Sequence, residues 1–306
     1  MRFACIVLLD FEEHDLAPED WHALGELADE LQRCRSSDPE LRARLAGADC
    51  LLVQLGVAVT PELVAAAPAL RYVGVFGTST GRIDVGERRI AVRNVPGFST
   101  EAVAEFAMGV VLEQLRELGL ARRRAAHGDF SEPIRHGREL RGRRLGVVGL
   151  GRIGRRVAEI ARHGFGADVS YWSRTARADA DLPRVELDAL LARSEIVSVH
   201  LALTSETRGL LDAGRIARIA DGALLVHLAP PELLDVGALI EHLRAGRLRF
   251  VTDHADEMER RDVEALSGIE ACTLYPPIGY GTREARATRR ERFLAELRSF
   301  LSPSAR

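Results

Sequence analysis

The stretch LGVVGLGRIG, which ends at Gly154, constrains the fold of this chain more than any other feature. An apolar run enters a G-x-G-x-x-G pattern, and a helical pattern follows. Gly149 suits a tight turn, Gly151 lets the backbone approach a phosphate, and Gly154 lets a helix pack against a strand. Arg152 and Ile153 begin the helix, whose free N–H groups favour an anion. The stretch therefore predicts a site for the pyrophosphate of a dinucleotide.

Short apolar runs alternate with helical patterns along the whole chain. Strands are expected at residues 3–9, 50–54, 71–76, 90–94, 144–148, 168–172, 196–201, 223–227, 249–252 and 271–274. Helices are expected at residues 19–33, from Thr60 onward, at 100–126 and at 282–301, and between the later strands. Continuous apolar strands that alternate with helices are typical of parallel sheets covered on both faces. The pattern therefore predicts an α/β fold.

The length of 306 residues favours two domains. The second series of strands needs no further element, so we expect the last helix to return to the first series. This predicts a discontinuous domain of residues 1–98 and 282–306, and a dinucleotide-binding domain of residues 99–281.

Composition narrows the possible partners. A net charge of −3 gives no general reason to expect nucleic acid, and no apolar run is long enough to span a bilayer. Every cationic side chain is Arg, which excludes a Schiff-base or Walker-type lysine. The four cysteines, Cys5, Cys34, Cys50 and Cys272, have no metal-site spacing. We therefore expect no metal site and a cytoplasmic protein.

The end of the strand expected at residues 168–172 bears on the choice of cofactor. NAD binders place an acid there for the ribose 2′-hydroxyl, whereas NADP binders place an Arg near the 2′-phosphate. Here Ser173, Arg174 and Thr175 follow the strand. This favours NADP, although NAD could bind if Arg174 is only a solvated residue. We also assign His200, near the end of the next strand, to the cofactor site.

Many short motifs resemble the D-isomer-specific 2-hydroxyacid dehydrogenase family over nearly the whole chain. They are Ile83-Asp84-Val85, Pro96-Gly97, Ala102–Glu105, Glu139–Gly142, Gly149–Gly154, Tyr171–Thr175, Leu203–Leu210, Gly246–Leu248, Pro276, Ile278-Gly279 and Thr282–Ala285. The resemblance implies a Rossmann domain and a flavodoxin-like substrate domain with the active site in the cleft between them. It also implies a homodimer formed through the helix expected at residues 100–126, and a small-molecule substrate.

The chain departs from the family where the family's catalytic residues lie. The family's substrate-binding Arg corresponds to Pro230, and its proton-donating His corresponds to Pro277. The Glu that orients this His falls on Glu259 if the alignment has no gap. Proline has neither charge nor hydrogen-bond donor, so it replaces neither residue. Ordinary 2-keto-acid reduction is therefore expected to be very slow or absent.

Other polar residues are candidate substitutes. Tyr280 lies just beyond Pro277 and is our preferred proton donor, and His227 ends a strand that borders the expected site. Alternatively, each of these two residues serves only in packing. Thr78 and Ser79 match the loop where the family binds the substrate carboxylate, and their alternative is a solvated turn.

Two functions of different class stay open at this point. One is an NAD(P)-dependent oxidoreductase with altered catalytic groups and an altered substrate. The other is a non-catalytic or regulatory NAD(P)-binding protein built on a dehydrogenase fold. The glycine-rich stretch supports the first, whereas the loss of both family residues at Pro230 and Pro277 supports the second.

Overall fold

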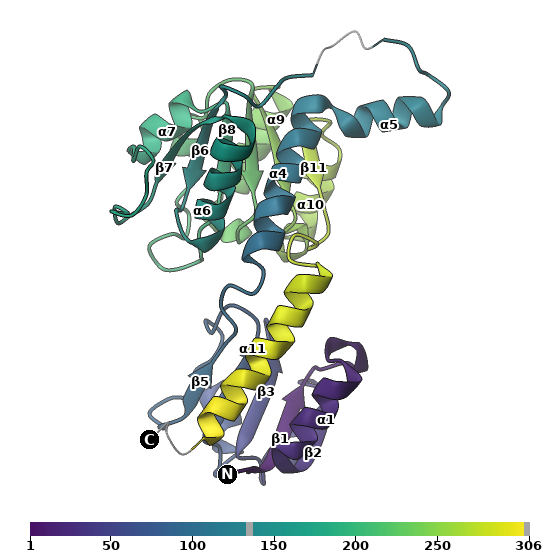
Figure 1. The fold of residues 1–306 in the computed structure, drawn as a ribbon, viewed down its shortest axis with the longest axis vertical. Coiled ribbons are helices and arrows are strands. Elements are labelled where there is room, and N and C mark those ends of the chain that lie inside the picture. The colour runs from purple at the N-terminus through teal and green to yellow at the C-terminus, as the bar shows by residue number, and fades with distance from the viewer. Residues whose placement is uncertain (133–136, 303–306) are drawn as a thin grey trace. The chain divides into compact units, whose positions relative to one another are not determined.

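The computed structural model describes residues 1–132 and 137–302. The chain divides into two compact units, one of residues 1–99 and 283–306 and one of residues 100–282. Each unit contains one parallel sheet with helices on both faces, so the predicted α/β fold is confirmed (Figure 1). In the part of the chain that the structure describes, no helix is long and apolar enough to cross a bilayer.

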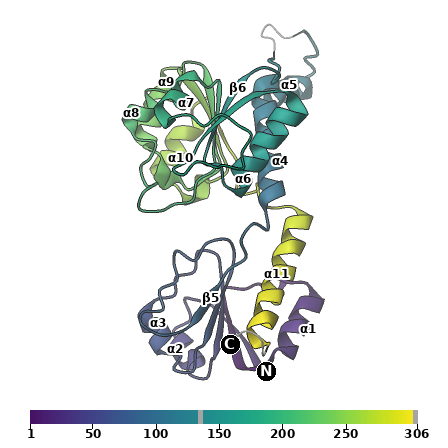
Figure 2. The same ribbon diagram turned by 60° about the vertical axis from the view of Figure 1, so that its left-hand side comes forward.

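The first unit has a five-stranded sheet in the order β2-β1-β3-β4-β5. Its strands are β1 (Phe3–Leu9), β2 (Ala28–Cys34), β3 (Cys50–Gln54), β4 (Tyr72–Phe76) and β5 (Ala91–Arg93). Its helices are α1 (Pro18–Glu26), α2 (Leu41–Leu45), α3 (Pro61–Ala65) and α11 (Arg283–Leu301), with a short turn η1 (Glu13–Asp15). Figure 2 shows α2 and α3 on one face of the sheet and α1 and α11 on the other. The order matches the flavodoxin-like arrangement of parallel strands.

The last helix packs onto the first sheet, as expected from the strand pattern. Phe293, Leu294 and Leu297 of α11 are buried in one core with Phe3 and Phe76. The rings of Phe76 and Phe293 meet edge to face with centroids 5.0 Å apart. This burial explains why the C-terminal residues belong to the first unit.

The helix expected at residues 19–33 is only partly correct. It ends at Glu26, and Ala28–Cys34 forms β2 instead. This segment reads ADELQRC and contains good helix formers, but it pairs in parallel with β1 from Phe3↔Ala28 to Leu9↔Cys34. β2 lies at the edge of the sheet, so its middle residues stay polar and mostly accessible. Pairing with β1 overrides the local helix propensity here.

The second unit has a six-stranded parallel sheet in the order β11-β10-β9-β8-β6-β7. Its strands are β6 (Arg144–Val148), β7 (Asp168–Trp172), β8 (Ile196–Val199), β9 (Ala223–His227), β10 (Leu248–Thr252) and β11 (Cys272–Leu274). Its helices and helical turns are α4 (Thr100–Arg116), α5 (Leu118–Ala126), α6 (Arg152–Glu159), η2 (Ile160–Gly164), α7 (Leu187–Arg193), α8 (Ala213–Ile216), η3 (Pro231–Leu233), α9 (Val236–Arg244), η4 (Ala255–Glu257) and α10 (Arg260–Ser267). Because β7 and β8 lie on opposite sides of β6, the strand order reverses at β6.

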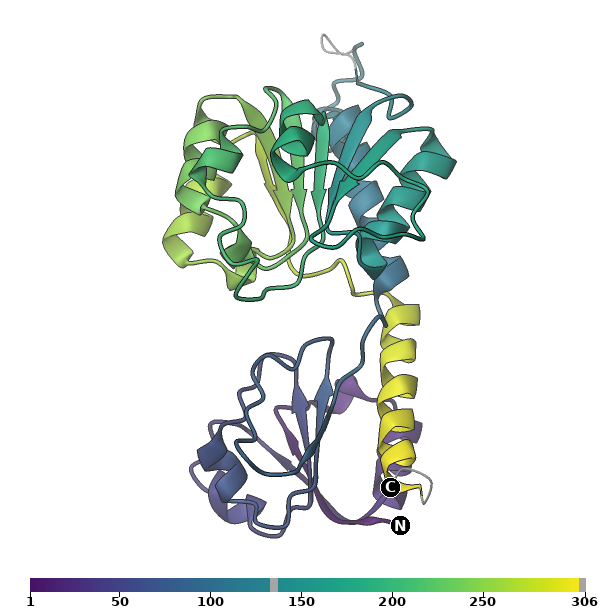
Figure 3. The same ribbon diagram turned by 90° about the vertical axis from the view of Figure 1, so that its left-hand side faces the viewer.

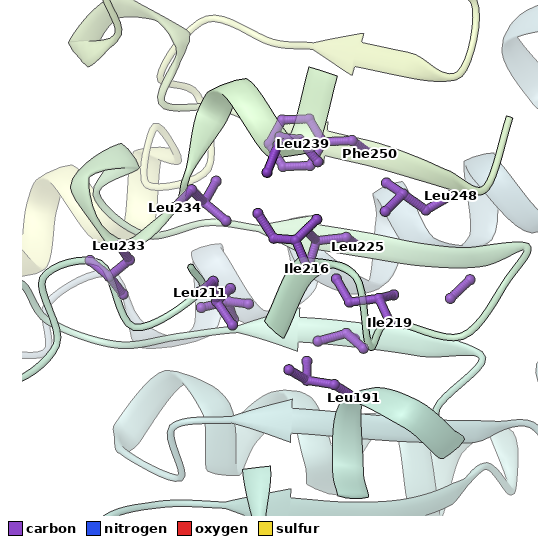
Figure 4. Close-up of a cluster of buried hydrophobic side chains, with 14 of the residues drawn as sticks. Leu191, Leu211, Ile216, Ile219, Leu225, Leu233, Leu234, Leu239, Leu248 and Phe250 are labelled. Atoms are coloured by element: carbon purple, nitrogen blue, oxygen red, sulfur yellow. The ribbon is translucent and has the colours of Figure 1, made fainter. Parts of the chain in front are cut away.

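Two cores cover the faces of this sheet. One contains Leu191, Ile216, Leu225, Leu239 and Phe250, beneath α7 to α10 (Figure 4). The other joins the opposite face to α4 and α6. Figure 3 shows these two helical layers on either side of the sheet. The continuous apolar strands of the sequence therefore correspond to a sheet buried on both faces.

The helix expected at residues 100–126 is broken in two. Glu117 adopts φ 51° between α4 and α5, a left-handed conformation that interrupts a regular helix. Met108 and Val111 of α4 are buried in the core of the second unit and are therefore not free to form a dimer interface. Leu118, the first residue of α5, remains 52% exposed.

Candidate functional site

The loop between β6 and α6 has the geometry that its three glycines predict. Gly149 has φ 99°, and a Cβ there would lie 2.6 Å from the carbonyl oxygen of His200. A Cβ on Gly154 would lie 2.0 Å from the carbonyl oxygen of Gly149. A Cβ on Gly151 would meet nothing within 4 Å, so the space beside this backbone is open. Two glycines thus shape the loop, and the third leaves room for a ligand.

The first turn of α6 can hold an anion. Gly151 is the N-cap residue, and Arg152, Ile153 and Gly154 present N–H groups that have no partner within a helix. The first turn contains no acidic residue, and Arg152 is exposed. The positive end of the helix and the open space at Gly151 fit a dinucleotide pyrophosphate.

The residues after β7 form a compact turn beside this loop. The buried Ser173 hydroxyl donates to the carbonyl oxygen of Thr175 at 2.6 Å, and Arg184 Nε donates to the carbonyl oxygen of Ser173 at 3.2 Å. Arg174 points outward and forms an ion pair with Glu206, which lies beyond β8. The guanidinium expected to face a ribose phosphate therefore has a carboxylate partner.

Three histidines lie at the carboxyl ends of neighbouring strands. His200 follows β8, His227 ends β9 and His254 follows β10. His200 Nε2 lies 2.7 Å from Ser198 Oγ, and burial lowers the pKa of His200 to about 4. Burial, together with His254 and His200, lowers the pKa of His227 to about 3, and neither ring nitrogen of His227 has a hydrogen-bond partner among the described residues. Both rings are neutral at pH 7.

His254 has the opposite electrostatic environment. Its Nδ1 lies 3.3 Å from Glu257 Oε1, and its Nε2 lies 3.8 Å from Asp253 Oδ1. Burial lowers its pKa, but these two carboxylates outweigh burial, so the pKa is raised. Burial raises the pKa of Asp253, which also accepts a 3.0 Å hydrogen bond from the backbone N–H of Gly279. This bond ties the segment after β11 to the end of β10.

Pro230 and Pro277, which the sequence resemblance aligns with the family's catalytic Arg and His, present no polar side chain. Pro230 is half-buried just after β9 and precedes the turn η3. Pro277 is exposed in the segment after β11. Tyr280 is 39% exposed near Pro277. Tyr275 instead donates its hydroxyl hydrogen bond to Glu113 and has its pKa raised to about 12 by burial and by this carboxylate.

The remaining candidates are Glu259 of the second unit and Thr78 and Ser79 of the first unit. Glu259 is the N-cap residue of α10, is 67% exposed and pairs with Arg261 at 2.8 Å. Glu257, two residues earlier, is the acid that contacts His254. Thr78 and Ser79 follow β4 in the first unit, where both are exposed.

The loop with Thr78 and Ser79 is held by its own bonds. Ser79 Oγ accepts from the backbone N–H of Gly81 at 3.2 Å, and the carbonyl oxygen of Thr78 accepts from Asn94 Nδ2 at 2.6 Å. All other candidates belong to the second unit. Among the residues that the structure describes, no three acid, His or Cys side chains gather closely enough to hold a metal ion.

Sequence reasoning gave no role to Asp253, Glu206 or Glu257. A signal for Asp253 is present, because an acid directly after a buried parallel strand lies at the edge where ligands bind. Glu206 lies in a loop seven residues beyond the end of β8, and no local pattern indicates that it meets Arg174.

Comparison with known proteins places the chain in a family. Residues 108–279 match the model of the D-isomer-specific 2-hydroxyacid dehydrogenase NAD-binding domain. Hydroxypyruvate reductase of Thermotoga maritima is 32% identical over 259 residues, covering 81% of this chain and 83% of the relative. D-3-phosphoglycerate dehydrogenase of Mycobacterium tuberculosis is 32% identical over 89% of this chain, which spans only 52% of that longer protein.

The fold agrees with solved structures. An acyclic imino acid reductase in complex with NADPH and D-Arg superposes with a TM-score of 0.88 at 24% identity, covering 97% of both chains. At this identity the likeness concerns the fold alone. Together with the strand orders, the glycine loop and the sequence matches, it shows that the chain belongs to the D-isomer-specific 2-hydroxyacid dehydrogenase family and carries its NAD-binding domain.

Proposed function

We propose that this protein is an NAD(P)-dependent oxidoreductase with altered catalytic residues, acting on a small carbonyl or imine substrate other than the family's usual 2-keto acids. The observation that carries the proposal is the glycine loop with its open space at Gly151, combined with Pro230 and Pro277 at the positions of the family's catalytic Arg and His. A bound reduced nicotinamide supplies a hydride in such a reaction.

The side chains of this protein then have separate roles. Gly149, Gly151 and Gly154 shape the loop, and the first turn of α6 binds the pyrophosphate. Tyr280 gives a proton to the reduced substrate, because it is accessible and lies three residues after Pro277, which aligns with the family's proton donor. Both ring nitrogens of His227 are buried without a hydrogen-bond partner among the described residues, so they could bind a polar group of the substrate or cofactor at the end of β9.

The other candidate residues have proposed roles of their own. His200 supports the glycine loop through its carbonyl oxygen, which lies against Gly149. Thr78 and Ser79 of the first unit bind the substrate. Glu259 contacts no histidine among the described residues, so its role rests on the family alignment alone and not on a contact.

A screen of NADPH oxidation with keto acids, aldehydes and imines tests the enzymatic proposal. We expect turnover with at least one aldehyde or imine, and a loss of about 10²-fold or more in Tyr280→Phe, which keeps the ring and removes the proton. Tyr171→Phe is a control, because the Tyr171 hydroxyl accepts from the backbone N–H of Arg177 in the second unit. An equal loss in both variants would contradict the role of Tyr280.

The second candidate function is a non-catalytic NAD(P)-binding protein. The observation that favours it is the absence of charge and hydrogen-bond donors at both Pro230 and Pro277. In that case the cofactor binds with ordinary affinity, but no compound in the screen is reduced. Binding without turnover across all three substrate classes would replace the enzymatic proposal with this one.

The proposed cofactor preference is NADPH over NADH. Ser173 and Arg174 follow β7, where an acid would repel a 2′-phosphate and an Arg can form a charge-assisted hydrogen bond with it. Fluorescence titration should show tighter binding of NADPH, and Arg174→Ala should weaken NADPH binding about tenfold. Arg218→Ala, which removes another exposed cation of the second unit, should change nothing. Equal affinity for both nucleotides in the wild type would contradict the preference.

We also propose a homodimer and a cytoplasmic location. Leu118, Leu120 and Phe130 expose 52%, 41% and 82% of their surface in or just after α5. Leu118→Glu should lower the mass measured by light scattering at micromolar concentration, whereas Leu55→Glu, which changes a similarly exposed Leu of the first unit, should not. A monomeric wild type would overturn the dimer. The cysteines are all free, which suits a reducing compartment.

A further inference from the structure

The ion pair between Arg174 and Glu206 joins two strand ends that are not neighbours. Arg174 lies two residues after β7, and Glu206 lies in the loop after β8. In the sheet, β7 and β8 flank β6 on opposite sides. The pair therefore reaches across the carboxyl end of β6, where the glycine loop begins.

The distance that the pair spans explains why two long side chains are needed. Adjacent strands lie about 4.8 Å apart, so β7 and β8 are separated by about 10 Å. Arg174 and Glu206 both extend from the surface, with side chains 73% and 59% exposed. Their charged groups meet over the end of the sheet at which a parallel α/β fold binds its nucleotide.

The backbone at both ends of the pair is held in place. In the loop with Glu206, the Thr207 hydroxyl donates to the carbonyl oxygen of Ala202 at 2.7 Å. The backbone N–H of Thr204 donates to Thr207 Oγ1 at 2.8 Å. At the other end, the Ser173 hydroxyl bond fixes the turn that carries Arg174. The carboxylate thus faces the guanidinium from a structured loop.

We propose that Glu206 is a specificity-determining residue that competes with the ribose 2′-phosphate of the cofactor for Arg174. A 2′-phosphate is attracted by Arg174 and repelled by Glu206, so NADPH must displace the carboxylate. A 2′-hydroxyl can donate to a carboxylate, which is how NAD binders hold this ribose. Arg174 therefore favours NADPH, Glu206 favours NADH, and their balance sets the preference. This inference rests on the proposed function of the same site.

The test is a titration of NADPH and NADH against the full-length protein and Glu206→Gln, which keeps the shape and removes the charge. Trp172 ends β7 directly before Ser173, so its fluorescence reports nucleotide binding without turnover. We expect the ratio of the NADH to the NADPH dissociation constant to rise at least about threefold, since exposed ion pairs change equilibria by a few-fold. When Glu206→Gln is combined with Arg174→Ala, the rise in this ratio relative to Arg174→Ala alone should be smaller.

A matched control is Asp221→Asn, which removes another exposed carboxylate that pairs with an Arg, 2.7 Å from Arg247 Nε just before β9. It lies at the amino end of the sheet and should leave the ratio unchanged. Glu206→Ala repeats the test with a smaller side chain.

The outcomes separate this inference from the proposed function. A ratio that rises less than about threefold in Glu206→Gln, or that rises equally in Asp221→Asn, overturns the role of Glu206 while nucleotide binding stands. A wild type that binds neither nucleotide overturns the proposed function, and the inference with it. A rise of about threefold or more, confined to the Glu206 variants and dependent on Arg174, supports the inference.

Discussion

The glycine loop and the strand ends at Pro230 and Pro277 belong to the same sheet, but they differ in how closely they resemble the family. The glycine loop matches the family's motif, whereas the two strand ends do not. The loop after β6 retains every glycine of its motif, with geometry that rejects a Cβ at Gly149 and Gly154. The segments after β9 and β11 contain Pro230 and Pro277, which the sequence resemblance aligns with the family's catalytic Arg and His. Pyrophosphate binding in this family depends on backbone N–H groups, whereas substrate chemistry depends on side chains.

This difference shows why cofactor binding and catalysis can diverge separately. Gly149 and Gly154 tolerate almost no substitution, because a Cβ at either position would lie too close to a backbone carbonyl oxygen. A strand end that faces the site accepts proline without disturbing the sheet, because it lies beyond the last ladder hydrogen bond. The fold and the nucleotide loop can therefore persist where the side chains at the strand ends differ.

The largest expected effect concerns the proline positions. Reduction of glyoxylate or pyruvate should be at least about 10³-fold below the usual enzymatic range of about 1 to 10³ per second. The physical reason is that neither Pro230 nor Pro277 can bind a carboxylate or give a proton. NADPH oxidation, followed by the loss of the absorbance of the reduced nicotinamide, measures this rate.

The double variant Pro230→Arg with Pro277→His sharpens this result. It should recover part of the 2-keto-acid activity, and each single variant should recover less, because the two groups act on the same substrate. Wild-type turnover in the usual range would contradict the comparison. Such turnover would mean that another side chain has taken over proton transfer. Tyr280→Phe would then test whether that side chain is Tyr280.

The next largest effect concerns the glycine loop. Gly154→Ala should weaken binding of either nucleotide by about 10²-fold or more and destabilise the second unit by about 1 to 3 kcal/mol, because the new Cβ overlaps the carbonyl oxygen of Gly149. Nucleotide titration and thermal unfolding measure the two effects. Gly151→Ala is the matched control, since its Cβ meets no protein atom within 4 Å.

Gly151→Ala should unfold at the wild-type temperature and lose affinity only for the nucleotide. If Gly151→Ala bound NADPH as tightly as the wild type, the open space beside Gly151 would not be the pyrophosphate site. If Gly154→Ala kept both stability and affinity, the tight packing of the loop would have no functional consequence.

The third effect appears only on acidification and concerns His227, the last residue of β9. Its pKa falls from 6.5 in the unfolded chain to about 3 in the folded protein because the ring is buried. Between these pH values the unfolded chain binds a proton that the folded chain does not, so the free energy of unfolding decreases as the pH falls. The contribution reaches up to about 3 kcal/mol at pH 4, since each pKa unit equals about 1.4 kcal/mol.

Urea unfolding of the wild type and His227→Leu at pH 7 and pH 4 measures this contribution. The variant should lose less stability on acidification, and the difference should develop as the pH falls from about 6.5. His254 has a raised pKa, so its protonation stabilises the folded protein as the pH falls. Both proteins contain His254, and this contribution is therefore the same in each. Equal losses in the two proteins would show that His227 already carries a proton at pH 7 or is not buried.

Much of the fold could be predicted from local patterns. The strands at residues 3–9, 50–54, 144–148, 168–172 and 223–227 lie where the apolar runs place them. The helix cap at Thr60 with Pro61 also forms, with Thr60 Oγ1 accepting from the N–H of Leu63 at 3.4 Å. Local patterns do not predict a segment whose structure depends on a distant element. Ala28–Cys34 is an example, because it forms a strand by pairing with β1.

The candidate site shows the same division. The glycine loop and the residues after β7 were predictable, because glycine patterns and strand ends are properties of neighbouring residues. The contact of Asp253 with Gly279 and the proximity of His254 to Glu257 were not, since each depends on how turns after the strands fold. Whether Tyr280, Glu259, Thr78 and Ser79 act on substrate stays a prediction.

By itself, the sequence determined the α/β class and the nucleotide loop, and it predicted that Pro230 and Pro277 replace the family's two catalytic side chains, because these depend on residue identity and on short periodic patterns. Only the tertiary structure decided that Arg174 meets Glu206 across β6 and that His227 is buried and neutral. Strand order brings together groups that lie far apart in the chain, and burial determines whether a side chain is charged. Neither strand order nor burial can be deduced from neighbouring residues alone.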